Sequence, residues 1–104
     1  MNTQNLYALF SDDPVEFNMN SLKAKLAIAL VALIRKNEWN QNTAAEKLQI
    51  SQPRMSNLFR GKLEKFSIDA ILQMFVRAGY KLETDFDPSN QKAPVSLTLK
   101  RAVL

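Results

Sequence analysis

The residues with the clearest chemical potential lie in one short run, Ser51-Gln-Pro-Arg-Met-Ser-Asn57. The amides of Gln52 and Asn57 carry a donor beside an acceptor, which matches the edge of adenine in the major groove of DNA. The guanidinium of Arg54 matches guanine or a phosphate, and the short hydroxyl of Ser56 reaches a base or nothing. We therefore interpret the Gln, Arg, Ser and Asn side chains of this run as candidate base readers.

Residues around this run have the character of contacts to the DNA backbone. Arg60, Lys62 and Lys65 follow it closely, near the expected helix end and the loop beyond, where they can meet phosphates. Ser51 and Gln41 stand at expected helix starts, where backbone N–H groups bind anions. A solvated basic loop explains the three cations equally well when they are considered alone. Their position beside the candidate readers favours phosphate contact.

Residue types that the chain lacks exclude most catalytic chemistry. It has no Cys and no His, which rules out a disulfide, a thiolate nucleophile, an imidazole base and an ordinary zinc site. Its two glycines, Gly61 and Gly79, are too far apart for a phosphate-binding glycine loop. Asp12 and Asp13 stand beside Pro14, a setting typical of a helix start. We therefore expect no metal, no cofactor and no enzymatic activity.

The positive charge is concentrated in the middle of the chain. The 104 residues include 14 bases and 10 acids, for a net charge of +4 and a pI near 9.6. Residues 21–65 hold nine of the bases and three of the acids. This distribution is typical of a protein that binds a polyanion, although charge alone slightly favours a merely solvated face.

Two short helices joined by a turn are expected to position the candidate readers. With about 100° per residue, Met55, Leu58 and Phe59 fall on the core side of a helix over residues 52–60, and the polar residues fall on the other side. A short amphipathic helix over residues 41–48 precedes it. This is the helix-turn-helix arrangement, whose second helix enters the major groove.

Two further helices are expected to frame this pair. Asp13 caps the first, and Asn18 and Asn20 are candidates for an interruption of it. Ser67 caps the last helix, which Gly79 ends in a left-handed conformation. The first helix carries its apolar residues on one stripe that we assign to the core: Val15, Met19, Leu22, Leu26, Leu30 and Leu33.

Two segments near the C-terminus predict β-strands. Residues 80–86 alternate apolar and polar side chains, and residues 95–99 do so more weakly. A lone strand is not stable, so the first segment pairs either with the second or with its copy in another chain. We expect antiparallel pairing with the copy across a twofold axis, which would bury Tyr80, Leu82 and Phe86 in a homodimer.

A longer motif surrounds the candidate readers: Asn40-Gln41, Ala44-Ala45, Leu48, Ile50 to Leu58, Arg60-Gly61-Lys62 and Phe66-Ser67. This motif resembles the Cro/CI-repressor (XRE) family of helix-turn-helix proteins, and within it the HigA-type antitoxins. The resemblance implies a mainly α fold, a lambda-repressor-like helix-turn-helix bundle with a C-terminal β-strand or short hairpin. The chain departs from the family at Gln49, where the turn normally has Gly, and a left-handed non-Gly residue costs about 1 kcal/mol.

The resemblance also implies function and partners. Proteins of this branch repress their own operon and neutralise a small RelE/ParE-like toxin encoded beside them. We expect a homodimer on a palindromic double-stranded operator, because one helix reads too few bases for useful specificity. Two alternatives stay open. One is a stand-alone XRE regulator of phage or host type, and the other is a protein-only antitoxin or adaptor with a vestigial helix-turn-helix.

The N-terminal segment carries a candidate toxin contact. Leu6, Tyr7, Leu9 and Phe10 are apolar, and three of them have the spacing of one helix face. Packing of this cluster on the chain's own core is the alternative. We divide the chain into this segment, a DNA-binding domain and dimerisation strands, over residues 1–13, 14–79 and 80–104.

Membrane insertion and export are not expected from the sequence. The longest uninterrupted apolar run covers nine residues, 26–34, whereas a bilayer span needs about 20. The first ten residues contain no Lys, no Arg and no apolar core typical of a signal peptide. We therefore expect a cytoplasmic protein.

Overall fold

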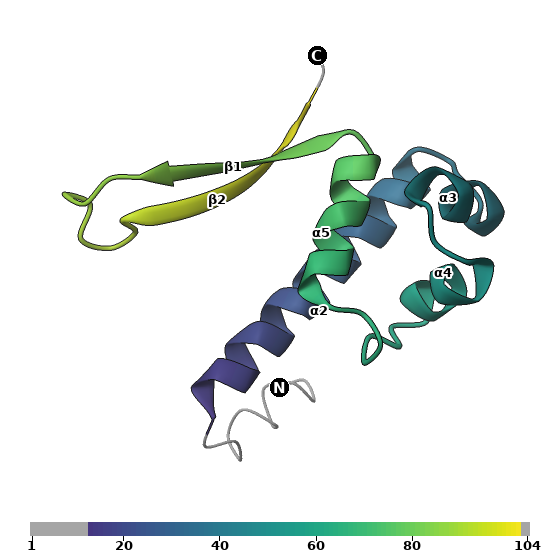
Figure 1. Cartoon of the computed structure of the whole chain (residues 1–104), viewed down its shortest axis with the longest axis horizontal. Coiled ribbons are helices and arrows are strands. Elements are labelled where there is room, and N and C mark those ends of the chain that lie inside the picture. The colour runs from purple at the N-terminus through teal and green to yellow at the C-terminus, as the bar shows by residue number, and fades with distance from the viewer. Residues whose placement is uncertain (1–12, 103–104) are drawn as a thin grey trace.

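The structure, a computed structural model, describes residues 13–102. Those residues form four helices and a two-stranded sheet (Figure 1). Helices α2, α3, α4 and α5 span Pro14–Lys36, Gln41–Leu48, Gln52–Phe59 and Ile68–Arg77, and strands β1 and β2 span Tyr80–Phe86 and Val95–Arg101. The predicted fold class, a helix-turn-helix bundle with a C-terminal hairpin, is confirmed.

Helix α2 begins as the sequence predicts. The Oδ1 atom of Asp13 accepts hydrogen bonds from the N–H groups of Val15 and Glu16 at 3.0 and 3.2 Å, and Pro14 occupies the first turn. The predicted interruption at the two asparagines was wrong, because the helix is continuous over 23 residues. Asn18 fits inside it by donating its side-chain amide to the carbonyl of Pro14, at 2.6 Å.

The turn between α3 and α4 closes in spite of its missing glycine. Gln49 adopts the left-handed conformation, with φ 59° and ψ 44°, and its N–H group still contacts the last turn of α3. Ser51 then caps α4 by accepting the N–H of Arg54 at 3.3 Å. Since the two helices are joined in the expected way, Gln49 does not disrupt the helix-turn-helix.

The core lies between the four helices and contains no buried polar side chain among the described residues. Phe66, from the loop between α4 and α5, completes it. The buried residues are Ala27, Leu30, Ile34, Ala44, Ala45, Leu48, Met55, Leu58, Phe66, Ile71, Met74 and Phe75. Removal of this apolar surface from water is the main force that holds α3 and α4 in place.

The two strands pair with each other as an antiparallel hairpin. Of the two partners that the sequence left open for residues 80–86, the structure shows the one within the chain, and residues 87–94 form an ordered connection. Pairing of residues 80–86 with their copy stays a prediction. The N–H of Asp87 donates to the carbonyl of Pro94 at 2.8 Å, and Asn90 Oδ1 accepts from Lys92 and Ala93. Pairing within the chain therefore satisfies the backbone hydrogen-bonding groups along one edge of each strand.

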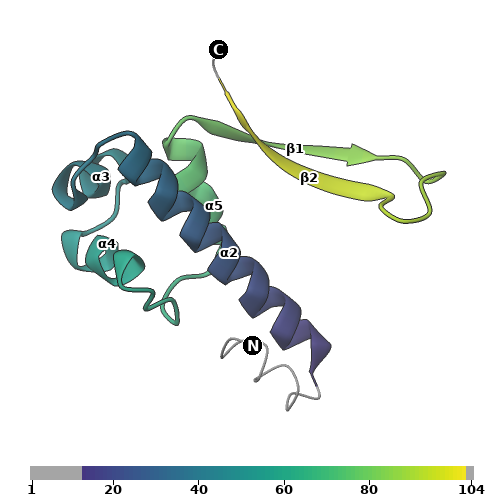
Figure 2. The same ribbon diagram turned by 180° about the vertical axis from the view of Figure 1, so that it is seen from behind.

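The first half of α2 is not covered by the bundle. Leu30 is buried, but Val15, Met19 and Leu22 on the same stripe are exposed. Their assignment to the core was wrong because α2, with 23 residues, is longer than its partner α5, with 10. Figures 1 and 2 show the first turns of α2 extending past α5.

Helix α2 is long and apolar enough to cross a bilayer by length and composition, and it is the one such helix in residues 13–102. The nine-residue apolar run in the sequence did not indicate this length, because polar residues interrupt the apolar stretch of α2. Two features are nevertheless typical of a core helix: Ala27, Leu30 and Ile34 are buried in the bundle, and Lys23 lies near the helix midpoint. A cation there would cost about 2.5–3.5 kcal/mol in a membrane. We therefore interpret α2 as a core helix.

Candidate nucleic-acid interface

Helix α4 buries one face and presents the other. Met55 and Leu58 are buried, as the helical wheel predicts. Phe59 is only half-buried, and the guanidinium of Arg35 lies over its ring, 5.4 Å from the centroid. Gln52 is the first residue of α4 and is exposed. The face available to a partner is thus the polar one.

Two predicted phosphate contacts stand at helix N-termini. Gln41 is the first residue of α3, behind the cap Asn40, whose Oδ1 accepts the N–H of Thr43 at 2.8 Å. Ser51 is the cap of α4. Its hydroxyl oxygen already accepts one backbone N–H, so an anion there would bind mainly the remaining N–H groups of the first turn.

Asn57 and Arg60 are joined on the polar face. A guanidinium nitrogen of Arg60 donates to Asn57 Oδ1 at 2.9 Å. Arg60 was assigned to the DNA backbone, but the structure places it beside a candidate base reader. The pair presents the Nδ2 donors of Asn57 and the remaining N–H groups of Arg60, so it offers mainly donors.

Arg54 lies on the flank of α4 and turns toward the following loop. Its guanidinium lies over the ring of Phe66, 4.4 Å from the centroid, and donates to the carbonyl of Lys65 at 3.5 Å. The side chain is half-buried. In this conformation Arg54 orders the loop, whereas the sequence predicts only a base contact for it.

Lys23, from α2, holds the same loop. Its Nζ donates to the carbonyls of Leu63 and Phe66 at 3.2 and 3.0 Å. Sequence reasoning included Phe66 only as part of the family motif and missed its contact with Lys23, which lies 43 residues away. A lysine on the inner side of an apolar helix was the one local signal, and it does not reveal a partner so distant in sequence.

The clamped loop presents two of the predicted phosphate ligands. Lys62 and Lys65 are exposed, and with Asn57 and Glu64 they line a hollow of about 260 Å³ beside α4. The lysines supply the positive charge that a phosphate needs, and Glu64 contributes an opposing charge at the same hollow. The structure therefore brings these lysines to the side of the candidate readers.

The other predicted sites lie elsewhere. Tyr80, Leu82 and Phe86 lie on the hairpin, away from α4 (Figure 1). The candidate toxin contact lies outside the described residues: Leu6, Tyr7, Leu9 and Phe10. In the described part of the chain, no three carboxylates gather in a way that could hold a metal ion.

Comparison with known families agrees with this geometry. The family described as helix-turn-helix domain matches residues 9–86, which include all four helices and β1. The chain belongs to the helix-turn-helix domain family. No curated protein matches the sequence. Membership of this helix-turn-helix family supports DNA binding, and the match identifies α3 and α4 as part of the family's domain while β2 lies beyond it.

Proposed function

We propose that this helix-turn-helix protein is a sequence-specific repressor of the XRE type that binds a palindromic operator as a homodimer. The observation that supports it best is the polar face of α4 beside a loop that two cations hold in place. A preorganised basic surface binds a polyanion without the cost of ordering it first.

Each predicted residue then has a role on the operator. Gln52 and Asn57 read bases, Ser56 contacts a base edge or none, and Arg54 holds the loop or swings to a base. The backbone set comprises Gln41, Ser51, Arg60, Lys62 and Lys65. Because Arg60 donates to one of the two lone pairs of Asn57 Oδ1 and adds its own N–H groups beside it, we expect the pair to face guanine, whose O6 and N7 both accept.

We further propose that the chain is the antitoxin of a type II toxin–antitoxin pair, resembling HigA, and that it autoregulates its operon in the cytoplasm. This rests on the motif from Asn40 to Ser67 and on the cluster Leu6, Tyr7, Leu9 and Phe10 as the contact with a RelE/ParE-like toxin. We propose no catalytic activity, since the chain has neither His nor Cys.

Selection of DNA sites from a random pool, followed by binding titrations, tests the repressor assignment. Gln52→Ala and Asn57→Ala should each weaken binding to the selected site by about 1–3 kcal/mol and leave nonspecific binding almost unchanged. Gln73→Ala, an exposed change on α5, serves as the matched control. Equal losses on both DNAs would reject base reading.

A salt titration tests the backbone set. Lys62→Ala should weaken binding to all sequences alike and reduce the salt slope by about one phosphate. An unchanged slope would remove Lys62 from the set.

The antitoxin assignment needs a separate test: the product of the adjacent reading frame should arrest growth alone, and co-expression of this chain should relieve the arrest.

A further inference from the structure

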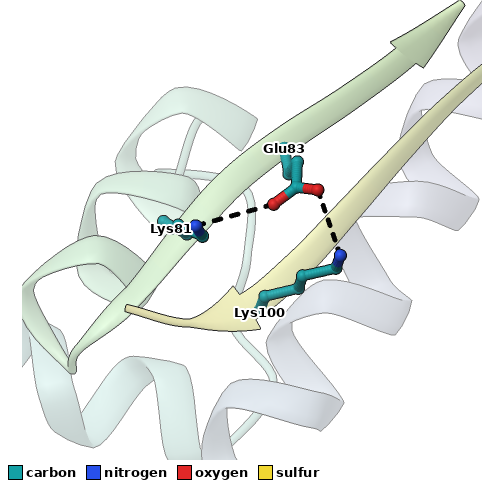
Figure 3. A network of polar contacts seen from close by, with 3 residues as sticks. All are labelled: Lys81, Glu83 and Lys100. Atoms are coloured by element: carbon teal, nitrogen blue, oxygen red, sulfur yellow. Dashed lines mark hydrogen bonds and ion pairs between the residues drawn. The ribbon is translucent and has the colours of Figure 1, made fainter. Parts of the chain in front are cut away.

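The hairpin has two chemically different faces. The strand register places Leu82 opposite Leu99 and Phe86 opposite Val95 on one face. The other face is polar, and Glu83 bridges Lys100 at 3.0 Å and Lys81 at 3.7 Å (Figure 3). Such a division is typical of a sheet that is solvated on one side and packed on the other.

Among the described residues, none packs on most of this apolar face. At the base of the hairpin, Tyr80 and Leu99 pack against the core, and the Tyr80 ring meets Phe75 edge-on with centroids 6.1 Å apart. Beyond them Phe86, Val95 and Leu97 are exposed. An isolated two-stranded hairpin is marginally stable in water, so this one gains from a cover on its apolar face.

The exposed start of α2 and the edge of α5 add to this surface. Leu82 and Val76 line a shared hollow that joins the hairpin to α5. In Figures 1 and 2 both segments extend toward the same side of the molecule, the hairpin from the C-terminal end of α5 and the first turns of α2 past its N-terminal end. We call the set the open apolar face: Val15, Met19, Leu22, Val76, Leu82, Phe86, Val95 and Leu97.

The α2 part of this face points away from the DNA-reading side. Ala24, Ile28 and Val31 line a groove between α2 and α4. With about 100° per residue, Met19 and Leu22 lie roughly half a turn around α2 from that groove. A partner on the open apolar face therefore leaves α4 free.

We propose that the open apolar face binds the same face of a second copy of the chain. Its eight residues are between 41% and 69% exposed. An aromatic side chain such as Phe86 offers roughly 150–250 Å², and aliphatic side chains offer less, so eight side chains that are about half exposed present on the order of 600 Å². A standard interface buries about 800 Å² per partner. These residues therefore supply most of the area that an isologous dimer of standard size buries.

The choice of a second copy as occupant rests on the proposed repressor function, because a one-helix reader needs two copies on a palindrome. The surface includes α2 and β2 residues that the strand-pairing hypothesis did not contain. Burial of the hairpin's apolar face, rather than pairing through the β1 edge alone, is what joins the copies.

Sedimentation velocity of the full chain at micromolar concentration tests the interface. Leu97→Lys and Met19→Lys should each raise the dissociation constant of the dimer by roughly a hundredfold. Ser96→Lys, on the polar face and opposite Asp85, and Asn20→Lys, beside Met19 on α2, are the matched controls and should remain dimeric. Far-ultraviolet circular dichroism verifies that all four variants keep their helices.

Three results would overturn the proposal. One is a wild-type chain that sediments as a monomer, including a chain that enlarges only with another protein or with lipid vesicles. The others are dimerisation unaffected by Leu97→Lys and Met19→Lys, and dissociation by only one of the two. A wild-type dimer that selects no DNA site would contradict the repressor function while leaving the interface intact.

Discussion

The loop after α4 and the hairpin after α5 are both extensions of the bundle, but they are held in different ways. Lys23 from α2 and Arg54 from α4 both contact residues 60–67, and Phe66 anchors this loop in the core. In the hairpin, Tyr80 and Leu99 are the described residues that pack against the core. One extension is secured within the chain, and the other presents apolar side chains to solvent.

This difference indicates which surface is ready to bind which partner. In the loop, carbonyl groups accept from cations, and the remaining lysines face outward with their charge available to phosphates. In the hairpin, the polar groups pair among themselves on one face and leave the other face apolar. A polyanion fits the first surface, and an apolar protein surface fits the second.

The largest expected effect is a difference in unfolding free energy between substitutions at two phenylalanines. Phe66 is 2% exposed and Phe86 is 69% exposed. Phe66→Ala should lower the free energy of unfolding by about 3–5 kcal/mol at any protein concentration, because it leaves a cavity under Arg54. Phe86→Ala should lower it by less than about 0.5 kcal/mol in the dissociated chain and by more as the protein concentration rises.

Urea titrations at two protein concentrations measure both values. The contrast between the regions would be lost if the two variants were equally unstable, or if Phe86→Ala were insensitive to concentration.

The next effect concerns base preference. Removal of the Arg60 side chain takes away its N–H groups and leaves both lone pairs of Asn57 Oδ1 free, so that the amide alone offers an acceptor beside a donor. Arg60→Ala should therefore move the preference at the base facing Asn57 from guanine toward adenine, by about 1–3 kcal/mol of discrimination. Site selection with the wild-type chain and the variant measures the change, and the base facing Gln52 is the internal control. Adenine preference in both proteins would contradict the role given to Arg60.

A smaller effect compares two serines. Ser51 caps α4 through its hydroxyl, whereas Ser96 is exposed on the polar face of the hairpin. Ser51→Ala should cost about 1 kcal/mol of unfolding free energy and weaken operator binding with it, since the cap starts the reading helix. Ser96→Ala should change neither quantity. Thermal melts and DNA titrations give the two measurements. Equal melting temperatures for the wild-type chain and Ser51→Ala would argue against the cap as a source of stability.

The smallest effect is a pH response of the hairpin. The hydrogen bond and charge of Lys100, with help from Lys81, hold the pKa of Glu83 below its ordinary value of 4.5. A lowered folded-state pKa contributes stability that is present above the unfolded-state value and is lost as pH falls through the folded-state value. Acidification below about pH 4.5 should therefore loosen the hairpin slightly, since exposed pairs contribute little.

Strand chemical shifts in nuclear magnetic resonance spectra report this change. Glu83→Gln should remove the contribution, and Glu46→Gln on α3 should not. A hairpin transition that persists unchanged in Glu83→Gln would assign the response to another group.

Local signals account for most of what the sequence predicts correctly. The caps at Asp13, Asn40, Ser51 and Ser67 each act within three residues, so their motifs are legible in one dimension. The apolar face of α4 likewise follows from helical spacing alone. Turn chemistry was less decisive, because Gln49 takes the left-handed conformation without the expected glycine.

Long-range contacts account for what the sequence does not reveal. The hydrogen bonds of Lys23 and the stacking of Arg54 on Phe66 depend on where a loop returns in space. Helical spacing identified the apolar stripe of α2, but the length of α5 decides how much of it is covered, and Val15 and Met19 lie beyond that length. Strand partners posed the same difficulty, since alternation shows a face and not the strand that pairs with it.

Lys23 connects the proposed dimer face with the loop beside α4. It lies next to Leu22 of the open apolar face, and its amine holds the loop beside α4. A second copy bound at Leu22 would therefore lie one residue from the side chain that holds this loop. If a second copy raises the affinity of the chain for the operator by some factor, the operator must raise the affinity between the two copies by the same factor, because coupled binding equilibria are reciprocal. Operator occupancy would then follow the square of the free chain concentration at low levels, so that modest dilution releases the DNA steeply.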